Sequence, residues 1–163
     1  MAVTTDDSPR PAHLEALRRS LDLRMDAEGR WWHDGQPFAH PRLTALFDRG
    51  VDLHPDTGEP ILRVDDTWCY FRADDTPFQV RRLALTGDTL TATLNNGQQL
   101  ALGPGARFEV DGDHVYLTAA PRRRARLTRQ AQAALADWLD EDEDGPVVCV
   151  GAARWRVGST PAG

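Results

Sequence analysis

The chain has 163 residues, 40% of them hydrophobic and 27% charged, which fits one soluble globular domain or two small ones that share a core. Its net charge of −6 argues against general nucleic-acid binding, and no apolar run approaches the roughly 18 residues that span a membrane. All 19 basic residues are arginine, which excludes a Walker-A lysine and a Schiff-base lysine. The polar N-terminus lacks the pattern of a signal peptide, so we expect a cytoplasmic protein.

The first 25 residues are expected to form a disordered tail, residues 1–10, and then a short amphipathic helix that starts at Pro11. Residues 26–75 are expected to form a first α/β half. In it, residues 30–33 and 36–39 predict a hairpin around Asp34-Gly35, because glycine accepts positive φ. A helix should then run from Pro41 to Gly50.

The second half, residues 76–157, is expected to be rich in β-structure and to end in a long helix. Short strands separated by turn residues predict one β-meander that already begins at residue 61. The predicted strands are 61–65, 68–73, 79–85, 89–95, 98–102, 106–110 and 114–118. The apolar stripe of residues 124–139 predicts the helix, a hairpin should span residues 146–157, and residues 158–163 should be a disordered tail. The fold class is therefore α+β, with a mostly antiparallel, curved sheet and flanking helices.

A cluster of arginines at the start of that predicted helix, Arg122-Arg123-Arg124, Arg126 and Arg129, forms the main electrostatic feature. Four of them, Arg122, Arg124, Arg126 and Arg129, are the candidate ligand-binding residues. A helix N-terminus also presents free N–H groups and a partial positive charge, which together would suit a phosphate or a carboxylate. The alternative is a solvated helix start whose arginines pair with acidic side chains of the protein.

Trp31 and Trp32 must point to opposite faces if residues 30–33 form a strand, so one of them lies outside the core. Trp32 and His40 are therefore candidate neighbours of the arginines in a binding site. The paired aspartates near residues 65 and 75 are turn caps or, alternatively, ligands of a hard metal.

Motifs for other chemistry are missing from the sequence. No serine lies in a G-x-S-x-G elbow, no G-x-G-x-x-G follows a strand, and the histidines show no zinc spacing. We therefore expect no cofactor, no metal and no catalytic residues. Cys69 and Cys149 are expected to be buried small hydrophobic residues, with a disulfide as the alternative.

Four segments, in order, resemble the domain-of-unknown-function family 1285 (DUF1285). They are Trp32-His33, Gly35, Pro37 and residues 43–47; residues 63–78, ending in Asp75, Pro77 and Phe78; residues 94–97; and residues 116–129, with Tyr116-Leu117 and Ala125-Arg126-Leu127. The resemblance implies two related α/β halves, the second like a pleckstrin-homology fold, and a small-ligand site between them. It also implies a nucleotide-like ligand and a signalling role.

The leading hypothesis is thus a non-enzymatic protein that binds a small anionic ligand through these arginines, with Trp32 and His40 beside them. A protein–protein interaction module that uses an exposed tryptophan and an edge strand is the alternative. A metal-dependent hydrolase that uses the aspartates is a third hypothesis.

Overall fold

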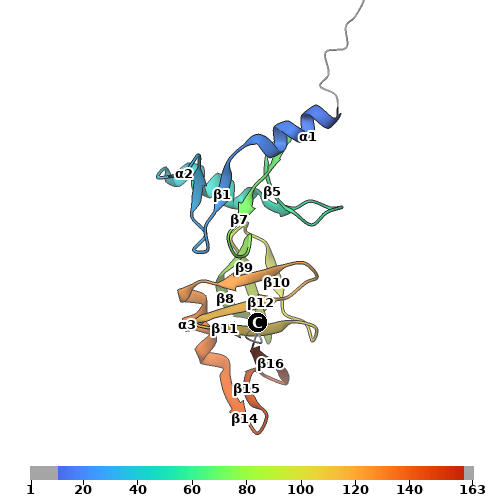
Figure 1. Ribbon diagram of the computed structural model, residues 1–163. Coiled ribbons are helices and arrows are strands. Elements are labelled where there is room, and N and C mark those ends of the chain that lie inside the picture. The colour runs from blue at the N-terminus through green and yellow to red at the C-terminus, as the bar shows by residue number, and fades with distance from the viewer. Residues whose placement is uncertain (1–10, 160–163) are drawn as a thin grey trace, which may run out of the picture.

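A computed structural model describes residues 11–159 and shows an α+β protein with mostly antiparallel sheets, as predicted (Figure 1). The elements follow one another along a long molecule. Helix α1 (Pro11–Ser20) lies at one end, and the last hairpins lie at the other (Figure 1). Residues 1–10 and 160–163 lie outside the described residues, so the predicted tails stay predictions there.

The first half contains two small sheets and one helix. One sheet has the order β3-β2-β1-β7, and the other has the order β4-β5-β6. Helix α2 spans Pro41–Gly50, as the sequence predicts, and His40 is its N-cap residue. The strands are β1 (Leu23–Met25), β2 (Trp31–His33), β3 (Gln36–Pro37), β4 (Val51–Leu53), β5 (Pro60–Val64), β6 (Thr67–Tyr70) and β7 (Arg72–Ala73).

The second half is a nine-stranded sheet of order β10-β9-β8-β13-β12-β11-β16-β15-β14. Its strands are β8 (Phe78–Thr86), β9 (Thr89–Leu94), β10 (Gln99–Ala101), β11 (Arg107–Asp111), β12 (His114–Thr118), β13 (Arg124–Leu127), β14 (Leu139–Asp142), β15 (Gly145–Val150) and β16 (Ala153–Ser159). The sheet is open, with β10 and β14 at its edges. The likeness to a pleckstrin-homology fold and the kinship of the two halves remain predictions.

The single meander predicted from residue 61 onward is wrong in two respects. Strands β5 and β6 belong to the first half, where β4 pairs with β5, and the prediction missed β4 as well as β1. In the large sheet, β8 pairs in parallel with β13, and β11 pairs in parallel with β16. Turn residues identify neighbouring hairpins, but they carry no information about these long-range parallel contacts.

The long helix predicted for residues 124–139 is also wrong. Residues Arg124–Leu127 form β13, in which Ala125 and Leu127 are buried and the two arginines point to the other face. Thr128 then caps helix α3 (Arg129–Leu135) by accepting a hydrogen bond from the Ala131 N–H, and a 3₁₀ turn ends at Trp138. The acidic residues that follow form β14 together with Leu139, and β16 extends to Ser159 into the predicted tail.

One hydrophobic core continues from the first half into the second. Met25, Trp31, Phe78, Leu90 and Phe108 are its largest fully buried side chains in the described chain, together with others from both halves. Trp31 donates a hydrogen bond of 2.9 Å from Nε1 to Asp48, and Arg81 of β8 contacts the other Asp48 oxygen at 2.7 Å. A buried carboxylate of α2 is therefore shared by both halves.

No helix within residues 11–159 is long and apolar enough to cross a membrane. Both cysteines are free and half-buried, so the alternative of a disulfide is wrong, and burial raises the pKa of the Cys69 thiol.

Candidate functional site

The turn between β1 and β2 belongs to the first half and contacts the second half at Gln79. Asp26 organises this turn: its carboxylate accepts hydrogen bonds from the Glu28 and Arg30 backbone N–H groups, the Arg30 guanidinium and the Trp32 indole. Burial raises the pKa of Asp26, but these hydrogen bonds outweigh burial and hold the pKa below its ordinary value. The turn is therefore fixed by an ionised carboxylate.

Gly29, in this turn, has a φ of +83° and touches Gln79 of β8. A Cβ at this position would collide with the Gln79 side-chain amide. Gln79 is buried and donates to the Ala27 carbonyl at 3.4 Å. The glycine thus permits a close contact between the two halves.

A cavity of about 460 Å³, which we call the junction cavity, lies where this turn meets the second half. The turn supplies one wall, and β8, β12, β13 and α3 supply the others. Its lining residues are Ala27, Glu28, Gln79, Asp113, His114, Arg126, Leu127, Thr128, Arg129 and Gln132. The cavity contains two of the four predicted arginines, and most of its other polar side chains can donate hydrogen bonds.

Arg126 is the most buried of these arginines, with 13% of its side chain exposed. It lies 3.3 Å from Asp75 and 3.8 Å from Glu28. Asp75 also accepts a hydrogen bond of 2.6 Å from Tyr116, and burial followed by that hydrogen bond raises the pKa of the Tyr116 hydroxyl. Arg126 is therefore held in place by Asp75 and shared with the first half through the exposed Glu28.

Arg129, the first residue of α3, is exposed at the rim of the junction cavity. Within residues 11–159 it forms no ion pair with a carboxylate, in contrast to Arg126. Gln132, one turn further along, donates to the Asp113 carbonyl at 3.2 Å. The guanidinium of Arg129 is thus the side chain most available to an anion in this cavity.

The other four predicted residues lie outside the cavity lining. Arg124 stacks on Tyr116, 3.7 Å from its ring centroid, and contacts Glu109 at 3.5 Å. Arg122 has a φ of +61° and is exposed. His40 is exposed at the start of α2, and Trp32 lies under Arg24 while its indole donates to Asp26. Trp32 contributes by fixing the turn that closes the cavity.

Sequence reasoning missed Gln79, His114 and Gln132. The position of Gln79 between the apolar residues Phe78 and Val80 was an available signal, because a polar residue between core positions needs a partner. His114 and Gln132 come together only through the pairing of β12 with β13 and the start of α3, which the long-helix prediction had hidden.

A second cavity of about 490 Å³ lies on the contact between α2, β5 and the turn after β9. Arg49, Arg63 and Arg123 line it with Asp52. Asp52 lies 3.1 Å from Arg63 and 3.8 Å from Arg123, so one carboxylate already links two of the three arginines. The second cavity therefore serves as a control for anion binding in the junction cavity, because both contain arginine side chains.

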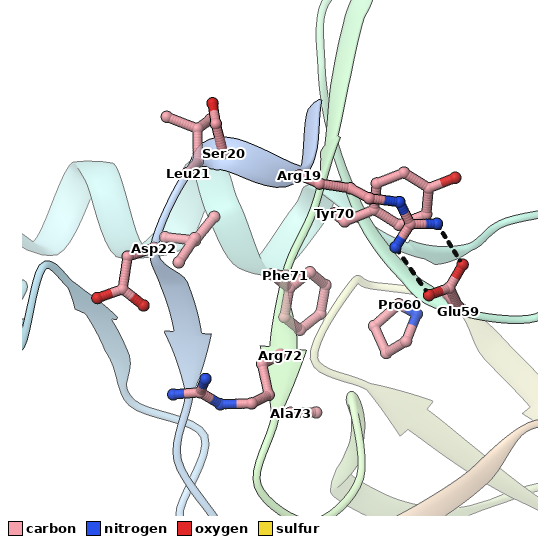
Figure 2. Close-up of a pocket in the computed structure, with 11 residues that line it drawn as sticks. Arg19, Ser20, Leu21, Asp22, Glu59, Pro60, Tyr70, Phe71, Arg72 and Ala73 are labelled. Carbon is pink, nitrogen blue, oxygen red and sulfur yellow. Dashed lines mark hydrogen bonds and ion pairs between the residues drawn. The ribbon is translucent and has the colours of Figure 1, made fainter. Parts of the chain in front are cut away.

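A third cavity, of about 550 Å³, lies between α1, β1 and β7 in the first half (Figure 2). Arg19 and Glu59 close one side by a bidentate ion pair with distances of 3.0 and 2.9 Å (Figure 2). None of the residues predicted for the anion site lines it.

In the described part of the chain, no group of three or more His, Cys, Asp or Glu side chains is arranged to hold a metal ion. The predicted aspartates divide into separate roles. Asp75 binds Tyr116 and Arg126, Asp74 pairs with Arg24, and Asp65 has a φ of +53° in the turn between β5 and β6.

No protein-family profile matches the sequence, and a comparison with curated proteins finds no match. Two solved structures do resemble the chain. A DUF1285 family protein from Silicibacter pomeroyi DSS-3 superposes with a TM-score of 0.61 at 21% identity, over 91% of this chain and 87% of that one. A DUF1285 family protein from Shewanella baltica OS155 gives 0.51 at 17% identity, over 72% and 92%. The resemblance found in the sequence is confirmed as a shared fold.

Proposed function

We propose that this chain, which has the fold of the DUF1285 proteins, is a non-enzymatic cytoplasmic protein that binds a small anionic ligand in the junction cavity. The observation that carries the proposal is the meeting of Arg126 and Arg129 in one cavity between the halves. Charge-assisted hydrogen bonds from arginine to phosphate or carboxylate are shorter and stronger than neutral ones. A nucleotide-like ligand fits this chemistry through its phosphate.

The cavity lining also holds two carboxylates, Glu28 and Asp113, and Asp75 lies 3.3 Å from Arg126, so acidic groups already offset the charge of the two arginines. An incoming anion therefore has to compete with Glu28 for Arg126. Glu28 is 60% exposed and 3.8 Å away, and such a loose surface pair contributes about 0–1 kcal/mol. Displacement of Glu28 thus costs little.

This competition gives a physical basis for a signalling role. Glu28 belongs to the first half and Arg126 to the second, so a ligand that takes over Arg126 removes one link between them. The Gly29–Gln79 contact and the Asp48–Arg81 ion pair stay as further links. Ligand binding would then loosen the turn without unfolding either half.

A thermal-shift screen with inorganic phosphate, nucleotides and small carboxylic acids tests the proposal. We expect one of these anions to stabilise the protein, and Arg129→Ala to weaken its binding roughly tenfold, as for loss of one charge-assisted hydrogen bond. Arg49→Ala is the matched control, because Arg49 is also exposed, lies in the second cavity and forms no ion pair within residues 11–159.

Two outcomes contradict the proposal. One is a screen in which none of these anions stabilises the folded protein. The other is a ligand whose binding is lost in Arg49→Ala and kept in Arg129→Ala, because that ligand would occupy the second cavity.

The interaction-module hypothesis has one observation in its favour. Strand β14 is an open edge of the large sheet, and Leu139 on it is 49% exposed. The remaining residues of β14 are acidic, which would select a basic partner strand. A pull-down with the protein and its Leu139→Glu variant would distinguish this function, because only a β14 partner is lost in the variant.

A further inference from the structure

Helix α1 contacts the first half through two arginine side chains as well as through leucines. The Cζ of Arg18 lies 3.9 Å from the ring centroid of Trp68, and that of Arg19 lies 3.9 Å from the centroid of Tyr70. Leu17 in α1 and Leu21 directly after it are each 50% exposed. Guanidinium groups of this helix therefore lie directly on aromatic rings of β6.

The surface that receives the two arginines is a cluster of aromatic rings. Trp68 and Tyr70 on β6 lie 5.2 Å apart, and the His54 ring lies 5.4 Å from Trp68 and 5.9 Å from Tyr70. The face of an aromatic ring carries partial negative charge and attracts a cation placed over it.

A carboxylate completes this cluster. Glu59 accepts two parallel hydrogen bonds from Arg19, which stacks on Tyr70 at the same time (Figure 2). The hydrogen bonds from Arg19 lower the pKa of Glu59, and the bonds to Glu59 raise the pKa of Arg19. A planar guanidinium can stack on an aromatic face and bind a neighbouring carboxylate through two hydrogen bonds at the same time. A spherical ion cannot make this combination of contacts.

We propose that His54, Glu59, Trp68 and Tyr70 form a binding site for the guanidinium groups of an arginine-bearing peptide, and that α1 occupies this site in cis. The partner is a segment with two adjacent arginines, since Arg18 and Arg19 engage neighbouring rings. The site has the opposite charge preference to the junction cavity and shares no residue with it. It therefore stands independently of the proposed anion binding.

The geometry also explains how the site is opened. Helix α1 is followed by only Leu21 and Asp22 before β1 begins, and it packs mainly on β6. Its ion pairs are exposed: the side chains of Arg19, Glu15 and Glu59 are 46%, 41% and 42% exposed. Contacts of this kind weaken as salt increases, so α1 can be exchanged for a competing segment while β1 stays in its sheet.

The test uses the full chain with Arg18→Ala and Arg19→Ala, which leaves the aromatic site empty. The probe is a synthetic peptide with the sequence of residues 11–22, titrated while the indole N–H signal of Trp68 is followed by NMR. We expect saturable binding to the double variant, and binding roughly tenfold weaker to the unchanged chain, where α1 competes. A peptide with glutamine in place of both arginines is the matched control and should not bind.

Three outcomes overturn the proposal: no binding by the folded double variant, equal binding of the glutamine peptide, or binding that persists after Trp68→Leu is added. If α1 only stabilises the fold, the folded double variant will not bind the peptide, which is the first outcome. Arg18→Gln keeps the Arg19–Glu59 pair and empties only the Trp68 ring, so it supplies the same test if the double variant does not fold. Binding of the peptide to Arg18→Gln at Trp68 supports the proposal, and its absence contradicts it.

Discussion

The two halves of the molecule reach a stable structure by different means. The second half is a continuous sheet in which buried and exposed residues alternate, as in the sequence Thr89–Leu94, where each even-numbered side chain is buried. The first half consists of two small sheets whose strands have two to five residues. Its parts are placed by polar anchors: Asp26 fixes the turn after β1, and Asp48 links Trp31 to Arg81. Periodic apolar burial builds the sheet, while single carboxylates position the first half and the turn that it contributes to the junction cavity.

The largest effect is expected from a cavity in the shared core. Phe78 is fully buried at the start of β8, where the two halves join. Phe78→Ala should lower the free energy of unfolding by about 3–5 kcal/mol. Chemical denaturation measures it, and coincident loss of signals from both halves is the expected result. Unfolding of the second half alone would show that the core is not shared.

The next effect concerns the buried anchor of the first half. Asp48→Ala leaves the indole N–H of Trp31 and the guanidinium of Arg81 without their acceptor, which should cost about 1–3 kcal/mol. Asp48→Asn is the control, because its amide oxygen can still accept from Trp31. Hydrogen exchange should quicken in β2 and α2 before it does in β8. Equal destabilisation by both variants would mean that charge alone matters.

A smaller effect on stability is expected from two glycine substitutions, which distinguish the cost of backbone strain from the cost of a steric clash at the junction. Gly29 and Gly35 have φ values of +83° and +74°, and only Gly29 faces a neighbour that a Cβ would strike. Gly35→Ala should cost about 1–2 kcal/mol through its left-handed conformation. Gly29→Ala should cost more and also perturb the NMR signals of Gln79. Identical stabilities would contradict a close contact between the halves.

The smallest effect is a pH response at the far end of the second half. Hydrogen bonds from Arg156 lower the pKa of Asp142 from 3.8 to about 2. A carboxyl group whose pKa is lower in the folded state adds stability above pH 4, and this stability is lost as the pH falls toward 2. Arg156→Gln should return the pKa of Asp142 toward 3.8, measured by NMR titration of its carboxyl carbon. An unchanged pKa of Asp142 in the variant would show that Arg156 does not cause the lowered value.

The sequence predicted the local elements well where the chemistry is local. Asp34-Gly35, Pro41 and the alternating strand at residues 89–94 specify their turn, helix and strand by nearby residues alone. The helix predicted over residues 124–139 failed because a strand with buried Ala125 and Leu127 precedes a capped helix, and the apolar spacing fits both. Only the parallel contact with β8 decides between them.

The candidate site was predictable only in part. Arg126 and Arg129 reach the junction cavity, but on a strand and at the start of a short helix, and the stacked arrangement of Arg124 draws it to Tyr116. Glu28 and Gln79 lie 51 positions apart in sequence, so their meeting depends on how the halves pack. The cluster of arginines in the sequence predicted an anion site, and the packing of the halves determines which of these arginines line the cavity.

The most direct test of anion binding at the junction is a ¹⁵N NMR titration of the full chain with inorganic pyrophosphate. The account predicts saturable shifts at Gln79, Thr128 and Gln132, and their loss in Arg129→Ala. Shifts confined to the surroundings of Arg49 and Arg63, or no shifts at all, would contradict it.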